Sequence, residues 1–156
     1  MNIKFKPKKK FFLLIPAVLA VILAGIYVLN RQEQESSLYR YADQIIEFCR
    51  GENYKPACYD KEIPKLMDYI SMEDAFKVTK LVQKQDSEYL YCHVLAHNLS
   101  AREIAKNPND WKDVINRCPS GMCSNGCIHR GFQERFRAES FTSEQVEGLI
   151  PDLQTL

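Results

Sequence analysis

The chain has 156 residues and a formal net charge of +1, which is long enough for one small domain and an anchor. Its charge is unevenly distributed, because the first ten residues carry five lysines and no acid. Beyond residue 29, 16 basic residues stand against 20 acidic ones, so this part is mildly acidic and has no basic patch that would indicate nucleic-acid binding.

The basic tail at residues 1–10 is followed by an uncharged apolar stretch at residues 11–29. A helix of nineteen residues, at about 1.5 Å each, spans a bilayer core of roughly 30 Å. The lysines indicate a cytoplasmic N-terminus, so we expect a single-pass signal anchor in the cell membrane, with the lipid bilayer as partner and the following domain exported. A cleaved signal peptide is the alternative, although the apolar run is longer than the usual 7–15 residues or so and no Ala-x-Ala site closes it.

The remainder consists of a polar segment at residues 30–37, either a short stalk or the frayed start of a helix, and a Cys/His-rich domain at residues 38–156. Apolar residues recur at helical spacing, and no useful strand alternation occurs, which predicts an all-α domain of six or seven helices. The expected helices cover residues 37–50, 63–70, from 72 onwards, 87–106, 109–118, from 126 onwards and 142–150. Expected N-terminal caps are Ser71, Asn109 or Asp110, and a capping box of Thr142 with Gln145. The apolar end at Leu153–Leu156 leads us to expect a C-terminally truncated chain.

The expected helix 87–106 carries two of the three histidines, His93 and His97. It is apolar nearly all round, which is typical of a buried helix. The four-residue spacing places both imidazoles on one face. His129 follows in the helix that begins near Gly126, on the same face as Phe132.

Three neutral imidazoles with an open fourth position are the ligand set of many catalytic zinc sites, and imidazole also suits copper and iron. The sequence therefore predicts a transition-metal site at His93, His97 and His129, with zinc preferred over copper or iron. No Glu follows His93 directly, so the His-Glu-x-x-His motif of metalloproteases is absent and a reaction is not indicated.

Six cysteines, all beyond the apolar stretch, indicate disulfides formed in an oxidising compartment. On a helix Cys127 points about 160° away from His129, whereas Cys123 lies in a loop and is free to turn inward. We therefore favour Cys92 as the partner of Cys123, a bond that would fix the two His-bearing segments against each other. The expected pairs are Cys49–Cys58, Cys92–Cys123 and Cys118–Cys127.

Other arrangements of these residues are open. His93 and His97 could join Cys123 and Cys127 in a four-ligand zinc site, although an oxidising compartment disfavours free thiolates. Covalent haem needs Cys-x-x-Cys-His, and the spacing here is wrong in two places; a thioredoxin-like motif is also absent. Alternatively, the three histidines are core residues bonded to carbonyls or to hydroxyls such as that of Ser100, and the protein is a non-catalytic, disulfide-stapled structural or interaction module.

Two short segments, Cys92-His93-x-x-Ala96-His97 and Gly126-Cys127-Ile128-His129, resemble the motifs of a group of uncharacterised membrane-anchored bacterial proteins. In that group the patterns are Cys-His-x-x-Ala-His and Gly-Cys-x-His-Gly, and here Arg130 stands where the final Gly is expected. The resemblance covers roughly residues 90–132. It implies importance for the Cys and His positions and brings no activity.

Overall fold

The computed structural model describes residues 11–136 and 143–154, and all regular secondary structure in these ranges is helical, as predicted. The chain divides into two compact units, residues 1–37 and 38–156. The first helix, α1 (Phe11–Cys49), contributes residues to both. Within the described ranges no helix has the length and apolar character needed to cross a membrane.

Helix α1 is continuous through residues 30–37, which favours the helical one of the two alternatives expected for this segment over a separate stalk. This segment is composed mainly of Arg, Gln, Glu and Ser and contains neither Gly nor Pro, so nothing in it interrupts a helix. Within the first unit, the side chains of residues 16–36 are exposed. Helix α1 ends at Cys49, just before Gly51, as the predicted first helix did.

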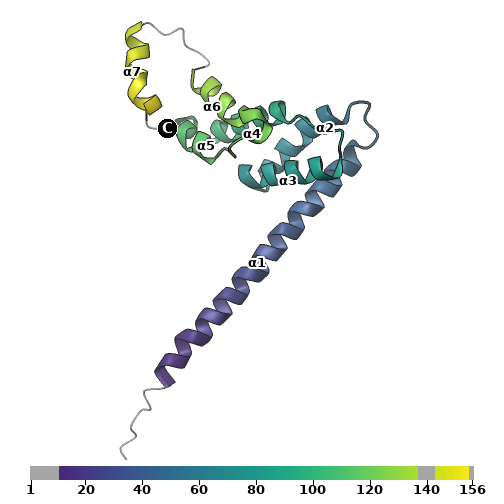
Figure 1. The fold of residues 1–156 in the computed structure, drawn as a ribbon, viewed down its shortest axis with the longest axis vertical. Helices are drawn as coiled ribbons and strands as arrows, with labels where there is room; N and C mark the ends of the chain where they lie inside the picture. The colour runs from purple at the N-terminus through teal and green to yellow at the C-terminus, as the bar shows by residue number, and fades with distance from the viewer. Residues whose placement is uncertain (1–10, 137–142, 155–156) are drawn as a thin grey trace, which may run out of the picture. The chain divides into compact units, whose positions relative to one another are not determined.

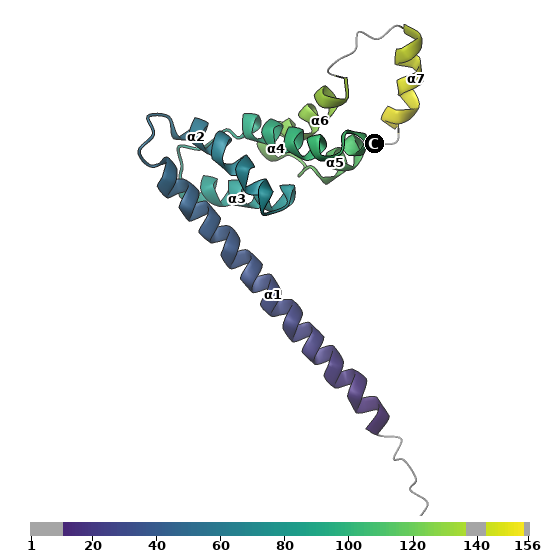
Figure 2. The same cartoon turned by 180° about the vertical axis from the view of Figure 1, so that it is seen from behind.

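The second unit begins with the last residues of α1 and continues as a series of short helices (Figure 1). In chain order these are α2 (Lys55–Glu62), η1 (Ile63–Asp68), α3 (Met72–Gln85), α4 (His93–Lys106), η2 (Pro108–Asp110), α5 (Trp111–Arg117), η3 (Met122–Asn125), α6 (Gly126–Phe136) and α7 (Ser143–Gln154), where η marks a 3₁₀ turn. Helix α4 is the central element, because it contacts α2, α3, α5 and α6 (Figure 2). Its most extensive contact is with α6.

The core of the second unit is formed by the apolar residues that recur at helical spacing. They include Leu38, Ala42 and Ile45 of α1, Ala75, Val78 and Val82 of α3, Leu95 and Leu99 of α4, and Trp111, Val114 and Ile115 at α5. Full burial of one large aliphatic side chain contributes about 1.5–3 kcal/mol. The N-cap of α3 is the predicted one, since the Ser71 side chain accepts a hydrogen bond from the Asp74 backbone N–H at 3.1 Å.

Two buried tyrosines connect α2 to the segment before α4. The Tyr59 hydroxyl donates to Asp86 at 2.6 Å, and the Tyr89 hydroxyl donates to Asp60 at 2.7 Å. The two rings lie 4.9 Å apart between centroids, and both are essentially inaccessible to solvent. Each hydroxyl is therefore satisfied by a carboxylate, which avoids the cost of burying an unpaired polar group.

The main corrections to the predicted elements concern their boundaries. Helix α2 was not predicted, although Pro56 in its first turn is a usual starting signal. The helix predicted at 63–70 is the 3₁₀ turn η1, which continues directly from α2. The N-cap residue of α5 is Asp110, one of the two predicted, although its side chain makes no capping hydrogen bond. A side-chain cap occurs one turn earlier, at η2, where Asn107 accepts from the Asn109 backbone N–H at 3.3 Å.

Helix α4 differs most from its prediction. It begins at His93 instead of residue 87, because the Asp86 carboxylate accepts a hydrogen bond from the Glu88 backbone N–H and holds a turn there. Nor is it buried on all sides: the side chains of Leu90 and Tyr91, before the helix, and of Val94 within it are exposed. Helix α7 includes Pro151 rather than ending before it, and the predicted cap at Thr142 lies outside the described residues.

Three disulfides cross-link the second unit, and they are the pairs favoured from the sequence: Cys49–Cys58, Cys92–Cys123 and Cys118–Cys127. The first joins the end of α1 to α2. The other two join the loop before α6 to the start of α4 and to α6 itself. The segments that carry the histidines are thus tied together covalently.

Candidate metal centre

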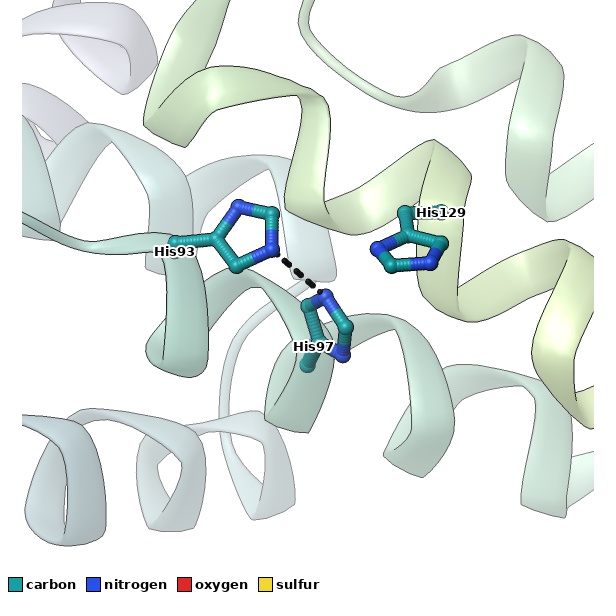
Figure 3. Close-up of side chains that lie close together, drawn as sticks. All are labelled: His93, His97 and His129. Carbon is teal, nitrogen blue, oxygen red and sulfur yellow. Dashed lines mark hydrogen bonds between the residues drawn. The ribbon is translucent and has the colours of Figure 1, made fainter.

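The first two histidines lie one turn apart at the start of α4. Their rings face each other, with the Nε2 atoms of His93 and His97 3.0 Å apart (Figure 3). Both side chains are half-buried. The spacing in the sequence therefore produces the shared face that was predicted.

Helix α6 brings His129 to the same place. The centroid of its ring lies 4.9 Å from that of His97 and 5.9 Å from that of His93. One nitrogen from each of the three rings lies within 4.8 Å of the others. His129 itself is exposed, contrary to the expectation that it shares an apolar face with Phe132. The structure thus gathers the three predicted residues at the α4–α6 contact, on a side open to solvent.

Close approach of α6 to α4 depends on Gly126, which the sequence indicated only as a helix start and as the first residue of the Gly-Cys-x-His motif. A Cβ atom at this position would lie 2.6 Å from the His93 carbonyl oxygen and 3.0 Å from its Nδ1 atom. Gly131 likewise permits α6 to approach α5 closely, since a Cβ atom at this position would lie 2.4 Å from Cγ1 of Ile115. Two glycines in α6 therefore permit the contacts that carry His129 towards α4.

The turn before α6 has an unusual backbone. Cys123, Ser124 and Asn125 have φ values of 51°, 51° and 57°, in the left-handed region that residues with a side chain seldom adopt. The disulfide to Cys92 holds this turn against the start of α4. One result is that the Cys123 carbonyl oxygen lies 3.1 Å from Nδ1 of His93.

These contacts determine which ring nitrogens carry protons. A carbonyl only accepts, so Nδ1 of His93 is the protonated nitrogen and its Nε2 atom carries the lone pair. Nε2 of His97 must then donate across the 3.0 Å contact to Nε2 of His93. On α6, the side-chain NH₂ group of Gln133 lies 3.4 Å from Nε2 of His129. An amide NH₂ group donates, so this ring nitrogen accepts and the proton of the neutral ring lies on Nδ1. A carbonyl that accepts from the other ring nitrogen, as that of Cys123 does from His93, orients the ring of a metal-binding histidine.

The surroundings of His97 favour its neutral form. Burial lowers the pKa of this ring, and electrostatic interaction with Arg130 and with any charge on His93 or His129 lowers it further. Metal ions bind the neutral ring. The ring of His97 is therefore neutral at neutral pH, although its Nε2 atom still carries the proton that it donates to His93.

Several sequence-based alternatives are wrong. All six cysteines are in disulfides, which leaves no thiolate for the four-ligand zinc site and no thiol for haem attachment. The Ser100 hydroxyl is fully buried and has no hydrogen-bond partner, so it does not support the histidines. The supporting groups are instead the Cys123 carbonyl and Gln133. The Cys123 carbonyl could not be recognised from the type of residue, because every residue has a carbonyl group. Gln133 could have been found, since it stands four residues, about one helical turn, after His129.

Comparison with known proteins adds no further assignment: no protein-family model, no curated protein and no solved structure matches this chain.

Proposed function

We propose that the protein binds a transition metal ion through His93, His97 and His129, with zinc as the first candidate and copper or iron as alternatives. The observation that carries this proposal is the convergence of three ring nitrogens within 4.8 Å. Two nitrogens bound to one tetrahedral zinc at about 2.0–2.1 Å lie roughly 3.3 Å apart. The 3.0 Å between His93 and His97 is already near that spacing.

Binding through Nε2 of His97 requires the proton on this nitrogen to move. In the metal-free arrangement, the proton on Nε2 of His97 occupies the space between the two rings of α4. A metal ligated by this nitrogen displaces that proton, and the ring keeps a neutral form by carrying it on Nδ1. His93 needs no such change, because its proton already lies on the nitrogen that faces the Cys123 carbonyl.

Metal analysis of the full-length chain with its disulfides intact tests the proposal. We expect one equivalent of bound metal, and we expect His93→Ala, His97→Ala and His129→Ala each to abolish stoichiometric binding. Val94→Ala is the matched control, because Val94 lies on the same helix with an exposed side chain that does not belong to the site. Failure of the oxidised protein to take up zinc, copper or iron on titration would refute the proposal.

A non-catalytic structural module is the second candidate, and one observation favours it. His93 has a carbonyl partner, and His93 and His97 satisfy each other, without any ion. Chemical unfolding with and without metal distinguishes the two. A ligand at 100 times its dissociation constant stabilises the folded state by about 2.7 kcal/mol, whereas a purely structural cluster gains nothing.

We also propose that residues 11–29 anchor the protein in the cell membrane with the C-terminal domain exported. Support comes from the five lysines that precede this stretch and from the large apolar side chains between Val18 and Leu29, which are exposed in the described part of the first unit. A reporter fused to the C-terminus should be active only outside the cytoplasm. Activity confined to the cytoplasm would refute this topology.

A further inference from the structure

We propose that the metal held by the three histidines keeps one coordination position open to solvent beside His129, and that this position takes an exchangeable small anion in a positive local field to which Arg130 contributes. This inference rests on the proposed metal site and concerns what that site binds. It would make the centre a receptor for small anionic ligands rather than a closed structural site.

The number of available ligands is the first argument. The chain has only three histidines, and all six cysteines are bonded to one another. Among the described residues, no Asp or Glu joins the group of three imidazoles. Closed structural zinc sites use four protein ligands, whereas sites with three keep a fourth position for water or substrate. The described residues therefore leave at least one coordination position to an outside ligand.

The direction of that position follows from burial. His93 and His97 are half-buried against the protein, while His129 is exposed. Figure 3 shows the rings of the two α4 histidines on one side of the group and the ring of His129, from α6, on the other. Solvent therefore reaches the centre along the α6 side. On the α4 side, Nδ1 of His93 lies 3.1 Å from the carbonyl oxygen of Cys123, in the tight turn that the Cys92–Cys123 disulfide holds.

Charge decides the kind of ligand. Three neutral imidazoles leave the charge of a divalent cation uncompensated, and no thiolate or carboxylate of the group offsets it. Arg130 directly follows His129 in α6, and its guanidinium interacts electrostatically with His97 across the group. Arg130 is paired with Glu134, and its Nε–H is buried without a hydrogen-bond partner. A divalent ion in such surroundings favours an anion over neutral water at its open position.

Cobalt(II) is the suitable probe, because its visible spectrum reports the number and kind of its ligands. The full-length oxidised chain is loaded with one equivalent of Co²⁺ and titrated with azide, and then with phosphate and bicarbonate. We expect a saturable change in the cobalt bands with at least one of these anions. The metal-free protein titrated in the same way is the control for absorption by the anion itself.

Substitution of Arg130 tests the source of the field. Arg130→Gln should weaken azide binding on the order of 3–10-fold at low ionic strength without weakening the binding of Co²⁺, because it removes one nearby positive charge. Arg135→Gln is the matched control: it removes the same charge from the same helix, where the guanidinium lies over the ring of Phe136. Equal azide affinities in the two variants would refute the role of Arg130.

The outcomes separate this inference from the proposed function. Stoichiometric binding of Co²⁺ with a spectrum that none of the three anions changes would overturn the open anion position and leave the metal site intact. Absence of Co²⁺ binding would overturn the proposed function and this inference with it. A saturable spectral change that Arg130→Gln weakens and Arg135→Gln does not would support both.

Discussion

Replacement of Gly126 by alanine tests most directly whether the close approach of α6 to α4 builds the metal centre. The added Cβ would lie 2.6 Å from the His93 carbonyl oxygen, where ordinary contact begins at 3.4 Å, so the two helices must separate locally by about 0.8 Å. The nearest atoms belong mainly to backbone and to the imidazole ring, which cannot turn away as the end of a flexible side chain does. Overpacking of this kind costs about 1–3 kcal/mol of unfolding free energy.

The same displacement should impair metal binding. Metal–ligand distances tolerate changes of about 0.2 Å, and His93 provides both the atoms that the new methyl group contacts and one of the three ligands. We therefore expect the affinity for zinc to fall at least about tenfold, which corresponds to roughly 1.4 kcal/mol. Urea unfolding measures the stability of the metal-free protein, and competition with a chromophoric chelator measures the affinity.

Two matched variants make the result interpretable. Gly131→Ala, on the same helix, would press against Ile115 and should lower stability with a smaller effect on metal affinity. Gly51→Ala has open space around its added Cβ and should change stability by no more than about 0.5 kcal/mol. If Gly126→Ala matched Gly51→Ala in both stability and zinc affinity, the reasoning that links helix approach to the site would be refuted.

Four further predictions follow from other contacts. Tyr89→Phe removes the donor to the partly buried Asp60 carboxylate and should lower the free energy of unfolding by about 1–3 kcal/mol, measured by urea unfolding; an unchanged midpoint would contradict the pairing. The hydrogen bond from Tyr59, with help from the Glu88 backbone N–H and Lys55, holds the pKa of Asp86 below its usual 3.8. Asp86 therefore contributes stability that is present above about pH 4 and is lost as the pH falls through its folded-state pKa, so the stability difference between the wild type and Asp86→Asn should shrink in acid; a pH-independent difference would contradict this. Replacing Cys92 and Cys123 together by serine opens a loop with a sequence separation of 31 and should cost about 3–4 kcal/mol in the chain-entropy model while weakening zinc binding, checked by unfolding and by chelator competition. Ser100→Ala removes a fully buried hydroxyl that has no partner and should leave stability unchanged or raise it by about 1 kcal/mol; a marked loss would show that the hydroxyl has a role.

The sequence by itself determined the helical class and the members of the candidate site. Apolar spacing places Ala75, Val78 and Val82 on one buried face of α3, and the same periodicity identifies the core face at α5. The pairing of Cys92 with Cys123 could be reasoned because a helix fixes the direction of its side chains, whereas a loop cysteine is free to turn. Helical periodicity is a local property, and the preference for Cys123 over Cys127 rests on the local geometry of each cysteine, so the order and spacing of residues along the chain are enough to predict both.

What the tertiary structure decided is how α4 and α6 meet. Burial of Val94 was expected from its residue type, but α4 has neighbours on only part of its circumference, and the side chain is exposed. Gly126 is needed because its Cα lies close to the carbonyl oxygen of His93, a residue 33 positions earlier in the chain. No local sequence pattern indicates that the two residues approach each other. The contact made by the Cys123 carbonyl could likewise not be predicted from the type of residue, because every residue has a carbonyl group. Its direction comes from a left-handed backbone held by a disulfide, and this long-range constraint fixes the tautomer of His93.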